Sequence, residues 1–263
     1  MTRHPTPDIE NIATMPRGGP DASWLDRHLQ TSRPEYLDRD DVPDERRQKI
    51  AAFLDRDGER TGHHDHNAHL VFDQIADIPN PRILELGAGH GGLSARVLDL
   101  HPAVEATVTD TDPASVADIK AGPLGAHPRA SIEVADATAI DTPEHSYDLV
   151  VFALAFHHLP PGVACQAIAE GTRAGKKFLV IDVKRPPAIV IVLAVLLVIP
   201  AALSLLAYCS PSAVAPVLHD AYISLLRSYS TSAFIALGAA ADSTITVEFL
   251  AAKQQAAVLF TKP

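Results

Sequence analysis

The residues most able to do chemistry in this chain lie in a glycine-rich turn within RILELGAGHGGLS, residues 82–94. A continuous apolar run precedes the turn and a helical pattern follows it, so the segment predicts a buried strand, a tight turn and a helix. Glycines let a backbone approach a ligand closely, and the helix behind them offers free N–H groups. The turn therefore predicts a site for a nucleotide-like cofactor.

Acidic residues end the next two predicted strands. Asp110 follows Gly89 by 21 positions, at the end of EATVTD, where a carboxylate can accept both hydroxyl groups of a ribose. Asp136 ends ASIEVAD and is placed to accept a hydrogen bond from the amine of an adenine. NAD and S-adenosylmethionine both contain these groups. The two acids thus predict an adenosine ligand without choosing between the cofactors.

Three histidines are candidates for removing a proton from a substrate. His157 and His158 follow the fourth predicted strand, at the edge where parallel sheets bind ligands, and a neutral imidazole there can act as a base. Packing against the following turn is the structural alternative. His219 lies in an apolar stretch whose only charged residues are Asp220 and Arg227. A base at His219 and a salt bridge between Asp220 and Arg227 fit that pattern equally well.

A histidine-rich run, HHDHNAH at 63–69, raises the question of a metal site. His66 and His69 lie three positions apart, a spacing that can present two imidazoles to one ion. No cysteine or distant acid completes such a set, and Cys165 and Cys209 match no metal or redox spacing. We interpret the run as a polar helix start and expect no metal ion.

The elements that must position these residues alternate between strand and helix. Parallel strands are predicted at 82–87, 105–112, 130–136, 147–155 and 176–183, with helices between them. Two final strands, at 244–251 and 256–263, are joined by a short polar turn at 253–255 and must be antiparallel. A helix over 231–241 precedes them, with Thr231 or Ser232 as the expected N-cap. The pattern predicts an α/β, doubly wound, Rossmann-like sheet of seven strands, mostly parallel, with an antiparallel C-terminal hairpin.

Composition divides the rest of the chain. Residues 1–22 are rich in proline and glycine and are expected to form a flexible arm. Residues 23–78 are dense in charge and predict an N-terminal helical cap on the sheet domain, which we assign to 79–263. Within that domain, residues 186–229 are predicted to be an apolar helical lid.

The most apolar part of the lid also has the length of a membrane-spanning helix. Residues 188–209 contain no charged side chain. Pro200 interrupts the run, and a spanning helix would separate the final strands from their sheet. We therefore predict two apolar helices that cover a ligand, with peripheral membrane contact and a homodimer interface through 186–229 as alternatives.

Charge and localisation signals narrow the class of partner. The net charge of −10 argues against a nucleic-acid ligand, which favours a basic surface. The N-terminus lacks the apolar run of a secretory signal, and the two cysteines fit a reducing compartment. We expect a cytoplasmic protein that acts on a small molecule.

The order of these motifs resembles that of the class I S-adenosylmethionine-dependent methyltransferases, above all their small-molecule branch. The resemblance rests on ELGAG at 85–89, Asp110, Asp136 with Ala137, and YDLVVFALAFHHLPP at 147–161, and it extends to the terminal hairpin. It implies S-adenosylmethionine as the cofactor. The cofactor contacts that it implies come from Glu85, Gly87, Ala88, Gly89, Asp110, Thr111, Asp136, Ala137 and Ala153.

The activity implied by the resemblance is transfer of a methyl group to a small, apolar or lipid-like acceptor, at oxygen or nitrogen. His157, His158 and His219 are then the candidate bases. One alternative is a module that binds S-adenosylmethionine without turnover, but such a module would be expected to have a damaged cofactor turn. The other is an NAD-dependent oxidoreductase, a class that generally lacks the terminal hairpin.

Overall fold

The computed structural model describes residues 12–39, 41–43, 46–47, 50, 53, 56, 58, 60–194, 196, 198–206, 211–252 and 255–263. Residues 1–11, Cys209 and the centre of the turn at 253–255 lie outside the described residues, and so do the predictions made for them.

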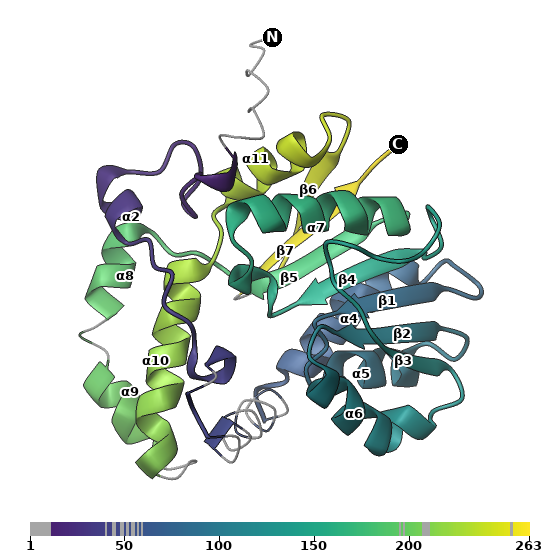
Figure 1. Ribbon diagram of the computed structural model, residues 1–263, viewed down its shortest axis with the longest axis horizontal. Coiled ribbons are helices and arrows are strands. Elements are labelled where there is room, and N and C mark those ends of the chain that lie inside the picture. The colour runs from purple at the N-terminus through teal and green to yellow at the C-terminus, as the bar shows by residue number, and fades with distance from the viewer. Residues whose placement is uncertain are drawn as a thin grey trace.

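A seven-stranded sheet forms the centre of the molecule, in the order β3-β2-β1-β4-β5-β7-β6 (Figure 1). The first five strands are parallel, and β7 is antiparallel to both β5 and β6. Their bounds are Arg82–Leu86 for β1, Glu105–Asp110 for β2, Ala130–Val134 for β3, Leu149–Ala153 for β4, Phe178–Val183 for β5, Thr246–Leu250 for β6 and Gln255–Thr261 for β7. The predicted fold class is confirmed.

Helices cover both faces of the sheet. On one face α4 (His63–Ile75), α5 (Gly92–Leu100) and α6 (Pro113–Ala121) pack on side chains such as Ile83 and Val108. On the other face α7 (Pro161–Ala174) and α11 (Thr231–Ala241) pack on side chains such as Leu84 and Phe178. Because both faces are buried, the inner strands are continuous apolar runs rather than alternating ones.

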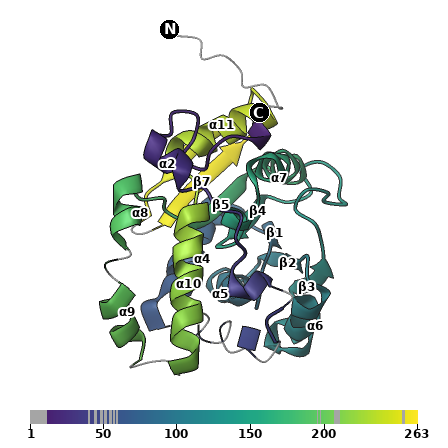
Figure 2. The same ribbon diagram turned by 60° about the vertical axis from the view of Figure 1, so that its left-hand side comes forward.

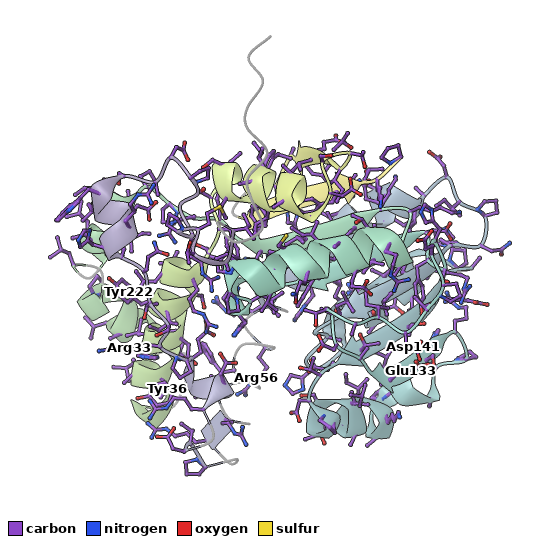
Figure 3. The ribbon with its side chains drawn as sticks, turned by 45° about the horizontal axis from the view of Figure 1, so that its top comes forward. Arg33, Tyr36, Arg56, Glu133, Asp141 and Tyr222 are labelled. Carbon is purple, nitrogen blue, oxygen red and sulfur yellow. The ribbon has the colours of Figure 1, made fainter. Side chains whose placement is uncertain are left out.

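A second group of helices lies beside the sheet (Figures 1 and 2). It contains α2 (Trp24–His28), α8 (Ala188–Ala194), α9 (Val198–Leu205) and α10 (Pro211–Arg227). Helix α10 contacts the short helices η1 (Tyr36–Asp38) and η3 (Phe156–His158), and α8 and α9 lie on its far side from the sheet. Figure 3 shows the two halves of the molecule: Tyr36 lies beside α10, whereas Glu133 lies at the β3 side of the sheet. A short helix, η2 (Pro123–Ala126), follows α6.

The apolar segment forms separate helices, as predicted, but Pro200 does not divide them. It lies in the first turn of α9, where its missing N–H costs no hydrogen bond. Helix α8 buries only Ile191, against Ile223 and Leu226 of α10. None of the helices described here has both the length and the apolarity to cross a bilayer.

The N-terminal segment differs from the flexible arm that its composition predicts. Ile12 and Met15 are buried in the core beside α7 and α11, and Arg17 is buried as well. The N-terminal cap of α11 is also one residue earlier than expected. Ser230 Oγ accepts a hydrogen bond from Ala233 N at 3.1 Å, and Ser230 N donates to Arg17 O at 3.0 Å. The buried side chains of Ile12 and Met15, together with the hydrogen bond from the N-cap residue of α11, hold residues 12–22 in place.

Candidate active site

The glycine-rich turn joins β1 to α5 at the carboxyl edge of the sheet. Gly87 has a φ of 62° and Gly89 a φ of 57°, in a region that residues with a side chain rarely adopt. A Cβ at Gly87 would lie 2.8 Å from Phe152 Cε2, so the turn could not pack on β4 without glycine. A Cβ at Gly89 would meet no atom within 4 Å. The turn thus leaves open space for a ligand at Gly89.

Glu85 is buried directly below this turn. Its carboxylate accepts hydrogen bonds from Ser94 N at 3.1 Å and from Ser94 Oγ. Burial raises the pKa of Glu85 to about 7, although the bonds from Ser94 oppose the rise. The carboxylate occupies the first turn of α5, which is where a dinucleotide turn would hold its diphosphate. A negative group there repels phosphate and fits a cofactor that is cationic and lacks phosphate.

The two predicted acids end neighbouring strands. Asp110 ends β2, and its carboxylate accepts hydrogen bonds from Gly89 N and from Asp112 N, both at 2.9 Å. Asp136 follows β3 and is exposed, with its carboxylate accepting from Thr138 N and Thr138 Oγ1 at 2.8 Å. Ala137 beside it is buried. The structure joins Asp110 to the glycine turn and leaves Asp136 at the next strand along the same edge.

The end of β4 lies against the same turn. Ala155 Cβ would be 3.4 Å from a Cβ placed at Gly87. Leu154, which follows the last residue of β4, has a φ of 58°, and residues in such sparsely populated conformations gather at functional sites. The chain then continues into η3, which contains the two histidines. Close packing at Gly87 therefore places the glycine-rich turn beside the segment that leads into the histidine pair.

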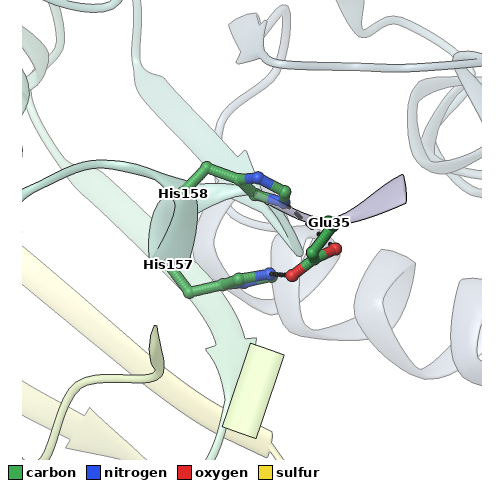
Figure 4. Close-up of side chains that lie close together, drawn as sticks. All are labelled: Glu35, His157 and His158. Carbon is green, nitrogen blue, oxygen red and sulfur yellow. Dashed lines mark hydrogen bonds and ion pairs between the residues drawn. The ribbon is translucent and has the colours of Figure 1, made fainter. Parts of the chain in front are cut away.

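His157 is held between two carboxylates (Figure 4). Its Nδ1 lies 2.7 Å from Asp182 Oδ1, its Nε2 lies 3.2 Å from Glu35 Oε1, and its backbone N donates to Asp182 Oδ2 at 2.6 Å. The side chains of His157 and Glu35 are 4% and 6% exposed. Burial alone would lower the pKa of His157, but Asp182 and Glu35 outweigh it and raise the pKa to about 10.

His158 approaches the same glutamate from the solvent side. Its Nδ1 lies 2.8 Å from Asp38 Oδ2 and its Nε2 lies 3.8 Å from Glu35 Oε2, and the side chain is 27% exposed. Arg227 donates to His158 O at 2.8 Å and lies 3.3 Å from Asp38 Oδ2. The salt bridge considered between Asp220 and Arg227 is not formed, because Arg227 pairs with Asp38.

His219 lies on α10, apart from the histidine pair. Its Nδ1 is 2.9 Å from Asp220 Oδ1, and Asp220 also accepts a hydrogen bond from Tyr36 N at 2.7 Å. Burial raises the pKa of Asp220 above its ordinary value. One turn further along α10, Ser224 Oγ donates to Glu35 Oε1 at 2.7 Å. Polar side chains of α10 thus face η1 and Glu35.

An open groove of about 470 Å³ adjoins His158. Arg17 and Arg227 give it positive charge, Gln30 and Ser32 add polar groups, and the apolar part of its wall includes Met15 and Pro160. Arg17 also donates to His157 O at 2.6 Å and to Arg227 O at 2.5 Å. The groove thus has both a polar and an apolar side.

Sequence reasoning missed the carboxylates that surround the histidine pair. Asp182 had a signal, because an acid near the end of a buried strand beside β4 needs a partner. Glu35 and Asp38 had none, since they lie in an irregular segment 122 and 120 positions from their histidines.

Comparison with known families settles the nature of the sheet domain. Residues 83–177 match the sequence profile of a family described as a methyltransferase domain. This part of the chain is a methyltransferase domain. The matched residues run from β1 to the residue before β5, so they include the glycine turn, Asp110, Asp136 and the histidine pair. No curated protein matches the chain significantly.

Solved structures share the fold of this methyltransferase at low sequence identity. The plantazolicin methyltransferase BpumL, solved in complex with SAH, is 12% identical with a TM-score of 0.61, over 97% of this chain and 98% of that one. PH0226 from Pyrococcus horikoshii is 14% identical with a TM-score of 0.54, over 78% and 92% of the two chains. YcgJ from Bacillus subtilis is 18% identical with a TM-score of 0.51, over 71% of each. At these identities the likeness establishes the fold.

Proposed function

We propose that the methyltransferase transfers the methyl group of S-adenosylmethionine to an oxygen or nitrogen of a small acceptor, which binds beside His158 at the carboxyl edge of β4. The observation that supports this most directly is the contact between the glycine turn and the end of β4. A Cβ at Gly87 would lie 2.8 Å from Phe152 Cε2 and 3.4 Å from Ala155 Cβ. These two residues come five and two positions before His157, the first histidine of the pair. A cofactor on the turn would therefore have its reactive end near the groove.

The residues that we propose to hold the cofactor are those that the sequence singled out. Asp110 would accept the ribose hydroxyls, Asp136 the adenine amine, and Glu85 would provide negative charge near the ammonium group of the methionine part. The full proposed set is Glu85, Gly87, Ala88, Gly89, Asp110, Thr111, Asp136, Ala137 and Ala153. When bound, S-adenosylmethionine supplies a methyl group on a sulfonium ion. The protein contributes alignment of that group with the acceptor, a contribution of about 7–11 kcal/mol in well-oriented pairs.

Of the three candidate bases, His158 has the best position. Both ring nitrogens of His157 face carboxylates, so neither is open to an acceptor. His219 is paired with Asp220 on α10, and its ring contacts the ring of Tyr36. His158 lines the groove and is partly exposed. We propose His158 as the residue next to the acceptor, with His219 as the weaker alternative.

The acceptor that fits the groove has a polar end and an apolar body. Arg17 and Arg227 would attract an oxygen-rich or anionic end, while Met15 and Pro160 would contact carbon. The sequence predicts an apolar or lipid-like acceptor, and the groove adds the polar end to that prediction. A complex of BpumL with SAH and a monoazolic desmethylPZN analog supports a small-molecule acceptor for this fold.

The segment 186–229 has two sides with different proposed roles. Through Asp220, Ser224 and Arg227, α10 faces the site, so we propose α10 as the lid. Helices α8 and α9 instead expose large apolar side chains, among them Ile189, Leu193, Leu196, Leu203 and Leu206. An apolar surface of this kind favours contact with a membrane, a second copy or the apolar body of the acceptor. We keep 23–78 as the cap and 79–263 as the methyltransferase domain.

The experiment that tests the proposal is a search for methylated products. Purified protein is incubated with cell extract and S-adenosylmethionine labelled in its methyl group, and labelled products are identified by mass spectrometry. We expect a labelled small molecule with the wild type. Asp110→Ala should lose the product together with cofactor affinity, whereas His158→Ala should lose it while retaining cofactor affinity. Label in protein or nucleic acid alone would contradict a small acceptor.

A further inference from the structure

We propose that Glu35, His157 and His158 bind a divalent transition-metal ion, with two imidazole nitrogens and one carboxylate as ligands. Among the residues that the structure describes, this is the only group of three histidine, cysteine or acidic side chains whose ligand atoms all lie within 4.8 Å of one another. No local sequence pattern indicates this group, because the glutamate comes from a segment far from the histidines along the chain.

The inner distances are those of ligands around one ion. Nε2 of His157 lies 3.2 Å from Glu35 Oε1, and Nε2 of His158 lies 3.8 Å from Glu35 Oε2 (Figure 4). Two ligand atoms about 2.0–2.2 Å from one ion, at angles of about 90–120°, lie roughly 2.8–3.8 Å apart. The His157 pair is also within hydrogen-bond distance, whereas the 3.8 Å between His158 and Glu35 is beyond it. Both inner distances fall in the range for shared coordination.

The outer contacts have the arrangement that surrounds metal-binding histidines. Nδ1 of His157 is 2.7 Å from Asp182, and Nδ1 of His158 is 2.8 Å from Asp38. A histidine that ligates a metal through one ring nitrogen almost always donates the other N–H to a carboxylate or carbonyl, which fixes the ring and its tautomer. Here both histidines donate outward in this way, and both turn Nε2 toward the same glutamate. Each of the two histidines thus combines an outer carboxylate at Nδ1 with an Nε2 that faces Glu35, which is the arrangement of histidines that bind a metal ion.

The donor set selects the class of ion. Imidazole nitrogens suit Zn²⁺, Cu²⁺, Fe²⁺ and Ni²⁺, whereas Mg²⁺, Ca²⁺ and Mn²⁺ prefer oxygen ligands. Two imidazoles with one carboxylate therefore favour the first group. Three protein ligands leave at least one position for another ligand, as in metal sites that bind substrates rather than sites that are purely structural.

The open position has a consequence for the acceptor, and this part of the inference rests on the proposed function. His158 lines the groove in which we propose that the acceptor binds. A bound ion would hold an acceptor with oxygen donors and lower the pKa of a hydroxyl bound to it, so that its proton is released more easily. His158 would then be a ligand and not a base. The predicted acceptor class is a small molecule whose reactive hydroxyl lies next to a second oxygen donor.

Metal uptake tests the site without any acceptor or turnover. Full-length protein treated with EDTA and then desalted is titrated with Co²⁺, and binding is followed by the visible absorption of the ion and by calorimetry. We expect one equivalent to bind to the wild type. Glu35→Gln and His158→Ala should each weaken Co²⁺ binding by at least tenfold. Asp38→Asn, which alters the outer contact of His158 and the pair with Arg227 but no ligand, should weaken it by roughly 10–100-fold.

A matched control separates this cluster from other histidines. His69→Ala removes an exposed imidazole from the run at 63–69 and should leave Co²⁺ affinity unchanged. Thermal unfolding of each variant checks that it is folded, and His158 is exposed enough for its removal to be tolerated. Equal Co²⁺ affinity in the wild type and His158→Ala, or absence of uptake by the wild type, would overturn the metal site. Uptake without methyl transfer to any small molecule would instead overturn the proposed function and leave the site standing.

Discussion

The cofactor side and the histidine side of this methyltransferase are built in different ways. On the cofactor side the decisive hydrogen bonds join residues close in sequence: Glu85 to Ser94, 9 positions away, and Gly89 to Asp110, 21 positions away. On the histidine side they join Glu35 to His157 and Ser224, 122 and 189 positions away. The cofactor side is therefore a local device within two βα units. The histidine side exists only when the N-terminal segment, the sheet and α10 have assembled.

The difference predicts what each side contributes. Polar residues of the cofactor turn lie at the surface of a complete sheet, so their loss should affect the ligand more than the fold. On the histidine side, Glu35 and Asp182 are buried among segments that they hold together, so their loss should affect the fold first.

The largest effect is expected on the histidine side. Asp182→Ala removes a carboxylate that is 2% exposed and accepts from His157 Nδ1, His157 N and Val183 N. Breaking such a buried pair leaves an uncompensated partner and should lower the free energy of unfolding by about 3–5 kcal/mol, measured by urea denaturation. Asp148→Ala, directly before β4, removes a pair with the exposed Lys176 and a hydrogen bond from Arg82 N, and it should cost less, about 1–2 kcal/mol. Equal losses in the two variants would remove the distinction.

The second effect concerns Glu85, the one cofactor-side group that is fully buried. Its pKa in the folded protein, about 7, lies above the ordinary value of 4.5. Between these values the folded state keeps a proton that the unfolded state releases, so the wild type loses stability as the pH rises from 4.5 to 7. Glu85→Gln lacks this titration. Its stability relative to the wild type should rise across that window by roughly 3 kcal/mol and level off above it.

Urea denaturation of both proteins between pH 4.5 and 8 measures this difference. Taking the difference in free energy of unfolding between the two proteins cancels the contributions of the other titrating groups, because both proteins contain them. A difference that stays constant across the window would mean that Glu85 is ionised throughout, so that burial does not raise its pKa.

The third effect is on ligand affinity. Asp110→Ala should weaken binding of S-adenosylmethionine by about 1–3 kcal/mol, because the ribose hydroxyls lose their acceptor. Its free energy of unfolding should change little, since Asp110 is only partly buried. Asp118→Ala, an exposed acid on α6, is the control and should leave the affinity unchanged. Calorimetry gives the affinities, and a large loss of stability in Asp110→Ala would break the proposed division of roles.

How much could be predicted from the sequence follows the same division. The order and class of the strands, the glycine turn and Asp110 were predictable, because each depends on hydrophobic periodicity or on a short motif. Glu35 could not be predicted as a partner of His157, since nothing in a local pattern reports a contact across 122 positions. The burial of Ile12 and Met15 was missed for a related reason: the prolines and glycines around them are typical of loose segments, and only the assembled core provides their site.

The smallest effect is expected on the outer helices. Leu206→Asp, directly after α9, replaces a half-exposed apolar side chain and should change the free energy of unfolding by less than about 0.5 kcal/mol. If the apolar surface contacts the acceptor, the variant should raise the KM for an apolar acceptor and leave cofactor affinity unchanged. Ser204→Asp, on the same helix, adds the charge without removing apolar surface and serves as the control. Dissociation of an oligomer, seen by sedimentation, would assign the surface to a second copy.

The glycine turn distinguishes S-adenosylmethionine from a dinucleotide through the acid at its base. The most direct measurement is calorimetric titration of the wild type with S-adenosylmethionine, its demethylated product and NAD under one set of conditions. We expect binding of the first two at one equivalent and none of NAD, because the Glu85 carboxylate occupies the start of α5 where a diphosphate would bind. Binding of NAD at one equivalent, with no heat from S-adenosylmethionine, would contradict it.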